Sequence, residues 1–512
     1  MMVRYFCLVS LLVFVSCTTE DNLGTIDKPN EDNCNHYIKL VAQNGSVFEP
    51  FQINDSIINV SVGADVDLHS LKLKLGRDCA GKDVLIDGSK CVEDTILDFT
   101  DFLTPHVLSV RTTDGRCYER IIQIYNIPVL TLETPDGGLI TSKTEKVKGC
   151  VIKIFDGEVK YEGTAGVEGR GNSTWVLPKK PYNIKLDKKH GFFGFPESKH
   201  WVLLANAYWD RTQMHNVIAY EMARLTDYPW VQSGRFVELI FNGTHQGLYY
   251  LCEKIRVEKR RINISIMDST AIHTEDMNGG YFIETAFSSE DKTFQTDYFN
   301  KTDAGNPLFW EIKEPDEELN ASQAKYIKSD LDHIEKLISN EDSVKAGKYR
   351  EYLDIESAIN WMLVNEVACN QETLNPSNLF LYKDKGGLLC FGPPWDFDAH
   401  TFGVYGEHKM FLQRSTFYYY WMMKDPIFVE RLKSKWASYK KIWLKEIPSF
   451  IDSLYTQLYP SALRNEQLWL DWFPMYGYPE KDYFTLITEM KSFFIDQVSY
   501  VDGILESMSA NR

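Results

Sequence analysis

The sequence of 512 residues lacks the features that identify three common classes of protein. No block of Lys and Arg could neutralise the phosphates along a nucleic acid, and the net charge of −17 opposes such binding. No CxxC motif or Cys/His pair has zinc-finger spacing. No apolar run reaches the roughly 20 residues that a membrane-spanning helix needs. We therefore expect no nucleic-acid partner, no zinc finger and no transmembrane helix.

The amino terminus has the pattern of an export signal. Arg4 precedes an apolar run over residues 5–15, which has the length of the hydrophobic part of a signal peptide. The run is followed by Ser16 and Cys17, which resemble a bacterial lipoprotein cleavage site. We expect a signal peptide at 1–16 and a lipidated tether at 17–33, and an exported lipoprotein of the outer membrane, cell surface or periplasm. The alternative is a secreted protein that is cleaved elsewhere.

Residues 34–128 alternate apolar and polar side chains as short strands do. We expect strands at residues 36–41, 57–62, 71–75, 106–111 and 120–125, separated by Gly and Asp turns. This pattern predicts a small Ig-like β-sandwich that acts as a spacer or docking module. Cys34, Cys79, Cys91 and Cys117 fall in the same region, where the sequence is compatible with one or two disulfides or with buried free thiols.

From residue 129 to residue 512 the pattern is longer and mixed. Strands are expected at 151–155, 182–186, 236–241, 247–252, 378–383 and 388–391, and helices at 213–225, 322–339, 355–368 and 426–447. A strand-rich first half followed by a helical second half predicts an α+β domain of two lobes with a cleft between them.

Two segments of this region carry chemical patterns. The turn at 169–175 (GRGNSTW) could bring backbone N–H groups close to phosphate oxygens, although such turns are also common in ordinary hairpins. Residues 394–398 (PWDFD) place Asp396 and Asp398 one residue apart at the end of a strand. A cation, above all Mg²⁺, would neutralise this pair, and the alternative is a solvated turn with a helix cap.

Several spaced motifs between residues 130 and 410 together resemble the CotH kinase family, named for spore coat protein H. They are residues 169–175, 179–186 (KKPYNIKL), 201–205 (WVLLA) with Asp210 and Asn216, 242–254 and 394–398. The resemblance implies an atypical protein kinase that uses ATP and Mg²⁺ to phosphorylate Ser residues of exported proteins. It also implies a two-lobed, protein-kinase-like domain over 129–512 that follows the N-terminal β-sandwich and has a helical C-terminal half.

The resemblance also implies roles for individual residues. Lys185, in a strand after the Gly turn, is the first choice for the lysine that contacts phosphate. The remaining nucleotide contacts would come from Gly169, Arg170, Gly171, Asn172, Lys180 and Glu253. Asp396 would bind the metal with Asn378 as a second ligand, and Asp398 would be an auxiliary carboxylate.

The sequence departs from the family pattern at two positions. Thr373 stands where active members have an Asp five residues before Asn378, and the adjacent Glu372 could replace it as the catalytic base. His215 stands where the family usually has Arg. An exported protein also meets little ATP, so the alternative is a catalytically inactive surface lipoprotein that binds a glycan or a protein partner.

The lipoprotein hypothesis makes a prediction about Cys17. Cys17→Ala should move the protein from the membrane fraction to the soluble fraction, because the rest of the sequence has no apolar run of spanning length. Fractionation followed by immunoblotting measures this distribution, and an unchanged membrane fraction would contradict lipidation at Cys17.

Overall fold

The structure is a computed structural model. It describes residues 38–510 except for 54–55, 77–78, 103, 112, 114, 207–208, 269, 274–276, 287, 317–318, 375, 377, 404–409, 411, 470 and 472–480. The predicted signal peptide and tether, including Cys17, lie outside the described residues, as does Cys34. Among the helices that are described, none is both long enough and apolar enough to cross a membrane.

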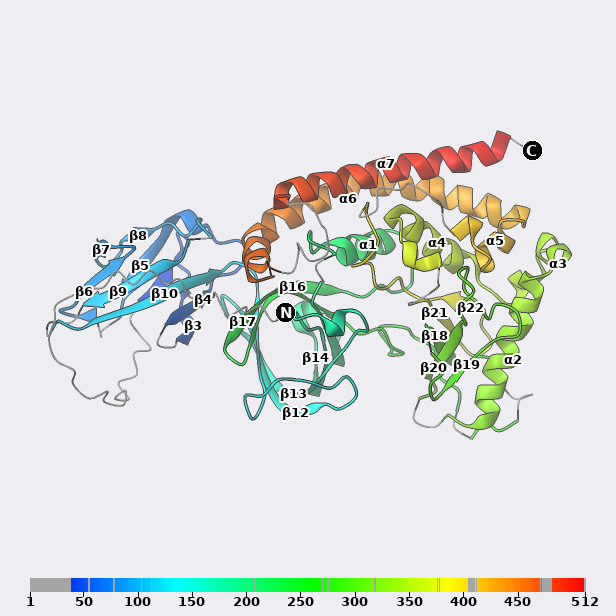
Figure 1. The fold of residues 1–512 in the computed structure, drawn as a ribbon, viewed down its shortest axis with the longest axis horizontal. Coiled ribbons are helices and arrows are strands. Elements are labelled where there is room, and N and C mark those ends of the chain that lie inside the picture. The colour runs from blue at the N-terminus through cyan, green and yellow to red at the C-terminus, as the bar shows by residue number, and fades with distance from the viewer. Residues whose placement is uncertain are drawn as a thin grey trace, which may run out of the picture.

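Two sheets form the N-terminal part of the chain (Figure 1). The first has the order β2-β1-β5-β8, with β1 at Ile38–Val41, β2 at Val47–Phe48, β5 at Leu71–Leu75 and β8 at Ile96–Leu97. The second has the order β3-β4-β10-β9-β6-β7, with β3 at Pro50–Ile53, β4 at Ile57–Ser61, β6 at Asp83–Ile86, β7 at Ser89–Cys91, β9 at His106–Arg111 and β10 at Cys117–Tyr125. The sheets share one core because alternate residues of both, such as Leu73 and Val60, are buried. Cys91 is a buried free thiol and Cys117 an exposed one.

A closed barrel of seven strands follows, in the order β11-β12-β13-β14-β15-β17-β16. The strands are β11 (Val129–Glu133), β12 (Val147–Asp156), β13 (Glu158–Gly169), β14 (Tyr182–His190), β15 (Ser198–Leu204), β16 (Gly234–Phe241) and β17 (Thr244–Glu253). Parallel pairing of β11 with β16, in which Val129 lies opposite Glu238, closes the barrel. Its interior is filled by buried side chains that include Trp201 and Tyr249.

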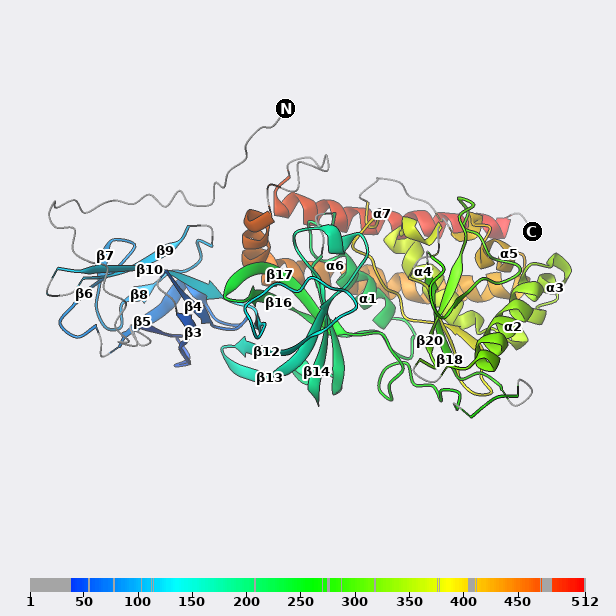
Figure 2. The same cartoon turned by 60° about the horizontal axis from the view of Figure 1, so that its bottom comes forward.

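The rest of the chain combines a five-stranded sheet with helices. The sheet has the order β19-β20-β18-β21-β22, with β18 at Tyr281–Ala286, β19 at Thr293–Phe294, β20 at Phe309–Glu314, β21 at Phe380–Lys383 and β22 at Leu389–Phe391. The helices are α1 (His215–Arg224), α2 (Ala321–Ile338), α3 (Glu341–Lys345), α4 (Ile355–Ala368), α5 (Tyr418–Met422), α6 (Pro426–Trp469) and α7 (Tyr483–Ala510). Helices α6 and α7 lie side by side along the barrel and the helices beyond it, as both views show (Figures 1 and 2).

The prediction of a two-lobed, protein-kinase-like α+β fold is wrong. The described chain is rich in β-structure, the region from residue 129 begins with a closed barrel, and a five-stranded sheet lies in the half that was expected to be helical. Alternation of apolar and polar residues identifies a strand but not its partner. The pairing of β11 with β16 joins strands that are far apart in sequence, so the local pattern could not predict closure.

A buried ion pair fastens α6 to the barrel. Arg464 of α6 donates from Nη2 to Oε1 of Glu238 on β16 at 2.8 Å, and His245 Nε2 lies 2.7 Å from the other oxygen of this carboxylate. Burial would raise the pKa of Glu238, but the charges of Arg464 and His245 outweigh it and lower the pKa to about 2. The Arg464 guanidinium also lies 5.3 Å from the ring centre of Tyr125 at the end of β10. The N-terminal sheets, the barrel and α6 therefore meet at one charged contact.

Candidate functional site

The two aspartates of the 394–398 motif lie on a loop that α1 holds in place. The Phe397 N–H, between Asp396 and Asp398, donates to Oδ1 of Asn216 in the first turn of α1 at 2.8 Å. Asp396 has a φ of 66°, in the left-handed region that side chains other than glycine rarely adopt. Such a conformation persists only where surrounding contacts impose it, and it is common at functional sites. The Asn216 contact therefore helps to fix the direction of both carboxylates.

Four carboxylates influence one another at this loop. Burial raises the pKa of Asp398 well above its ordinary value, and Asp396, Glu372 and Asp210 raise it further by repulsion. Burial and the charge of Asp396 raise the pKa of Glu372 to about 8. Asp398 is buried, whereas Asp396 and Glu372 are partly exposed. Negative charge in this cluster is therefore poorly compensated by the protein itself.

Asn378 contacts the same cluster from the segment before β21. Its Nδ2 donates to Oδ2 of Asp396 at 2.9 Å, and its own φ is 59°. Burial raises the pKa of Asp396, and the charge of Arg170 with hydrogen bonds from Asp398 and Asn378 offsets part of this rise. The structure thus brings together all the residues predicted to be catalytic or metal-binding, namely Glu372, Asn378, Asp396 and Asp398.

The cluster suits a hard divalent cation for two reasons: its ligand atoms are oxygens, and its negative charge is not neutralised by the protein. The arrangement is not that of a closed metal site, because no three His, Cys, Asp or Glu side chains in the described residues are positioned to hold a metal ion. Asn378 presents its NH₂ group, not its oxygen, to Asp396. Rotation of this amide by half a turn would present its oxygen, so the residues fit a cation after local rearrangement.

One cationic side chain from the barrel, Arg170, acts on the Asp396 carboxylate, and a second, Lys254, lies near Arg170. Arg170 follows the last residue of β13, and its guanidinium carbon lies 5.2 Å from the ring centre of Trp395. Lys254 follows the last residue of β17, where burial and the nearby charge of Arg170 lower its pKa to about 8, against the opposing effect of Glu168. Two like charges held close together in a partly buried place favour an anion between them. Sequence reasoning missed Lys254, although it is adjacent to Glu253 in the motif at 242–254.

Lys185, the first choice for the phosphate-binding lysine, is exposed on the outer face of β14. It lies opposite His200 of β15, and burial together with the charges of Arg256, Lys254 and Lys185 lowers the pKa of His200 to about 3. Lys185 is thus near the same cationic face, but no contact in the described part of the chain joins it to Asp396 or Arg170. Lys180 is used locally, since its Nζ donates to the Trp175 carbonyl oxygen at 2.5 Å.

The glycines of the predicted phosphate turn are required by packing within the turn. A Cβ on Gly169 would lie 2.2 Å from the Trp175 ring, and one on Gly171 would lie 2.0 Å from Oγ1 of Thr174. Lys143 braces the turn through the Gly171 carbonyl oxygen at 3.0 Å and Oδ1 of Asn172 at 3.4 Å.

Glu253, predicted to line a nucleotide pocket, is buried in structural contacts. Its Oε2 accepts from the Ser233 N–H at 3.0 Å, and its Oε1 accepts from Nε of Arg261 at 3.2 Å. Because both oxygens are engaged, the carboxylate mainly supports the end of β17.

Comparison with known proteins identifies the family. The model of the CotH kinase protein family matches residues 167–500, which include the whole charged cluster and more than half of the chain. The chain belongs to the CotH kinase family. The resemblance inferred from the spaced motifs is therefore confirmed.

Other comparisons add little to this CotH family assignment. No curated protein matches the sequence. One similar solved structure is a crystal structure described as a "putative glycoside hydrolase" from Bacteroides thetaiotaomicron, with 13% identity over 52% of this chain and 67% of that chain. Its TM-score of 0.14 is too low to support any argument about fold or function.

The two departures from the CotH pattern have distinct local roles. Thr373 is buried and its hydroxyl donates to the Asn370 carbonyl oxygen at 2.7 Å, so it cannot replace a catalytic carboxylate. His215 is buried, and burial lowers its pKa against the opposing charge of Asp210. Its Nδ1 lies 3.1 Å from Oγ1 of Thr401, which donates to the Phe397 carbonyl oxygen at 2.6 Å. A neutral His215 thus supports the loop that carries Asp396 and Asp398.

The raised pKa of Asp398 predicts how stability depends on pH. A carboxyl whose pKa is raised in the folded state favours folding at low pH, and this advantage is lost as the pH rises above the unfolded value near 3.8. In chelator, Asp398→Asn should therefore raise the thermal midpoint progressively between about pH 5 and pH 8 relative to the parent protein.

Asp482 provides a matched control of opposite sign. The Thr485 N–H holds the pKa of this exposed carboxyl below its ordinary value, so Asp482→Ala, which removes the acceptor, should lower the midpoint at neutral pH. Differential scanning calorimetry measures both variants. If the difference in thermal midpoint between Asp398→Asn and the parent protein did not change with pH, the raised pKa of Asp398 would be contradicted.

Proposed function

We propose that this CotH family member transfers the γ-phosphate of ATP to Ser side chains of exported proteins, in a reaction that requires Mg²⁺. The observation that carries the proposal is the position of Arg170, which lies over Trp395 and whose charge offsets part of the rise that burial causes in the pKa of Asp396. Phosphoryl transfer is catalysed mainly by positioning and by neutralising charge, so it needs cations for the phosphates beside carboxylates for a metal.

Each side chain has a proposed role. Arg170 and Lys254 bind phosphate oxygens, while Lys185 is exposed on β14 opposite His200. Asp396 and Asp398 would hold Mg²⁺ with the oxygen of Asn378. The bound cation would supply neutralisation of the negative charge on the phosphates.

Glu372 is the proposed general base. It is partly exposed beside Asp396, and it precedes Thr373, whose hydroxyl is engaged with the backbone. Its carboxylate would accept the proton of the Ser hydroxyl as the new O–P bond forms and the bond to the ADP leaving group breaks. The substrate would meet the enzyme outside the cytoplasm if Cys17 carries a lipid anchor.

Phosphate transfer from labelled ATP to co-exported proteins tests the proposal. Asp396→Ala should abolish transfer, because the transferring group would lose a principal source of charge neutralisation. Glu372→Gln should lower the rate by about a hundredfold or more, which is typical for loss of a general base. Glu162→Gln, an exposed change on β13, is the matched control and should leave the rate unchanged.

The contradicting result is specific. If the parent protein binds Mg·ATP but transfers no phosphate to itself, to casein or to co-exported proteins, the transferase proposal fails. The absence of an Asp at Thr373 would then explain a protein that binds without catalysis.

A further inference from the structure

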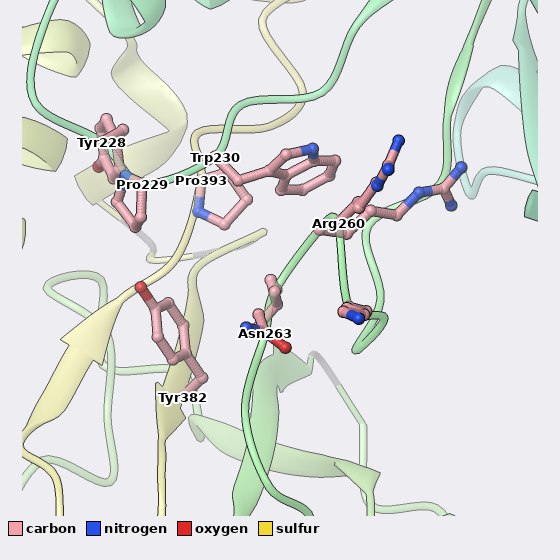
Figure 3. Close-up of a pocket in the computed structure, with 10 residues that line it drawn as sticks. Tyr228, Pro229, Trp230, Arg260, Asn263, Tyr382 and Pro393 are labelled. Carbon is pink, nitrogen blue, oxygen red and sulfur yellow. The ribbon is translucent and has the colours of Figure 1, made fainter. Parts of the chain in front are cut away.

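A basic groove lies next to the charged cluster. It consists of two cavities of about 430 and 770 Å³ that share the lining residues Lys259, Arg260 and Arg261. One wall of the smaller cavity is aromatic and comes from Tyr228, Trp230 and Tyr382 (Figure 3). Both cavities have the size of ordinary ligand sites.

The groove carries an excess of positive charge in a chain whose net charge is −17. Lys259 and Arg260 are exposed and form no ion pair with any described residue, and Lys189 also lines the larger cavity. Two carboxylates line the larger cavity, Glu197 and Glu258. Glu258 already pairs with Arg261 at 3.6 Å and with Arg256 at 3.4 Å, so Glu197 is the carboxylate that could offset the charge of Lys259 and Arg260. The groove therefore attracts anions more strongly than the surface around it.

Two polar atoms of residues that line the smaller cavity have no hydrogen-bond partner among the described residues. They are Nη2 of Arg261, whose side chain is buried, and the hydroxyl of Tyr228. Buried polar atoms are normally paired, so each such atom calls for a physical explanation. Both atoms lie beneath the cavity surface, so a ligand in the groove would contact them only after a local rearrangement.

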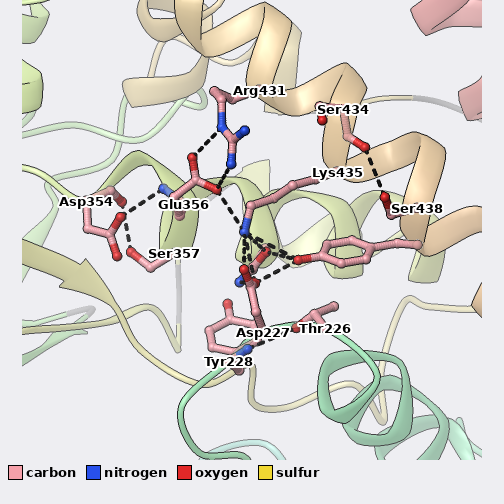
Figure 4. Close-up of polar contacts among 12 residues, drawn as sticks. Thr226, Asp227, Tyr228, Asp354, Glu356, Ser357, Arg431, Ser434, Lys435 and Ser438 are labelled. Carbon is pink, nitrogen blue, oxygen red and sulfur yellow. Dashed lines mark hydrogen bonds and ion pairs between the residues drawn. The ribbon is translucent and has the colours of Figure 1, made fainter.

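The part of the aromatic wall that contains Tyr228 is anchored to α6 through the preceding residue. Asp227, which precedes Tyr228, accepts hydrogen bonds from Nζ of Lys435 at 2.8 Å and from the Tyr439 hydroxyl at 2.7 Å, both on α6 (Figure 4). Lys435 also lies 3.1 Å from Glu356 of α4. Burial raises the pKa of Asp227, but these hydrogen bonds outweigh it and lower the pKa to about 2. A wall fixed in this way loses little entropy when it binds a ligand.

We infer that the basic groove binds an acidic, extended segment of a polypeptide, and that this segment belongs to the protein acceptor. Exposed cations pair with carboxylates, while aromatic and proline surfaces hold apolar side chains. Two cavities that share one set of cations suit an extended chain better than a compact ligand. The role as acceptor site rests on the proposed phosphate transfer.

The groove is close enough to the charged cluster for this role. Pro393 lines the smaller cavity and is three residues before Asp396, so their Cα atoms are at most about 11 Å apart. Gln232 also ties the two sides together, since its Nε2 donates to the Pro394 carbonyl oxygen at 2.7 Å. An acceptor held in the groove could therefore present a nearby Ser to Glu372 and Asp396.

Binding of a fluorescein-labelled peptide rich in Glu, Pro and Tyr to the full chain tests the inference without nucleotide. The peptide should bind, and affinity should fall with added salt. The same peptide with Gln in place of Glu should bind far more weakly. Lys259→Ala with Arg260→Ala should weaken binding of the Glu peptide by about tenfold or more, and so should Trp230→Ala.

A matched double variant distinguishes binding in the groove from a general effect of the protein's positive charge. Lys72→Ala with Lys74→Ala removes two exposed cations from β5 and should leave affinity unchanged. Equal affinity of the Glu and Gln peptides, or no loss in the groove variants, would overturn the inference. Binding of an oligogalacturonate to the groove without binding of the peptide would also overturn it.

The readout separates this inference from the proposed function. Peptide affinity is measured without phosphate transfer. If the protein binds the peptide but transfers no phosphate, the groove is supported as a peptide site and the proposed kinase activity is contradicted. Transfer to an acceptor without any binding of the Glu peptide would instead overturn only the groove.

Discussion

The clustering of carboxylates around the buried Asp398 is the constraint around which the candidate site is organised. Burial raises the pKa values of Asp398, Asp396 and Glu372. Repulsion by Asp396 raises those of Asp398 and Glu372 further, and Glu372 and Asp210 add to the effect on Asp398. Uncompensated charge of this kind destabilises a fold, so its presence points to a ligand that supplies positive charge. The left-handed backbone at Asp396 and Asn378 and the contact from Asn216 keep the carboxylates together despite this cost.

The barrel supplies the opposite charge. Arg170 and Lys254 follow the ends of β13 and β17, which are separated in the barrel by β14 and β15. Side chains alternate along each strand, so the residues that fill the barrel interior leave their neighbours on the outer face. Closure of the barrel and the position of the Asp396 loop on α1 together place cations beside carboxylates. The candidate site thus depends on the contact between the barrel and the elements that follow it.

Local sequence patterns predicted individual elements well and their assembly poorly. The strand at Leu71–Leu75 and the helix at Ile355–Ala368 have the expected bounds, because one alternates strictly and the other is rich in apolar residues after the N-cap Asp354. The helix that begins at residue 426 was expected to end before Pro448, but α6 continues through this proline. Buried residues on both sides, such as Ile447 and Ile451, maintain the helix. The acidic residues of the site were predicted from the motif at 394–398 and the family resemblance. Lys254 was missed, because its proximity to Arg170 depends on barrel register.

The central claim is that Arg170 and the Asp396 cluster bind a nucleotide through its phosphates and a divalent cation. Calorimetric titration of ATP with and without Mg²⁺, into the parent protein and Arg170→Met, tests it most directly. Met keeps apolar contact with Trp395 but removes the charge. The account predicts Mg²⁺-dependent binding that weakens by roughly ten- to a hundredfold in Arg170→Met, the range for loss of a charged hydrogen bond. Equal affinity in the two proteins, or binding that does not depend on Mg²⁺, would contradict it.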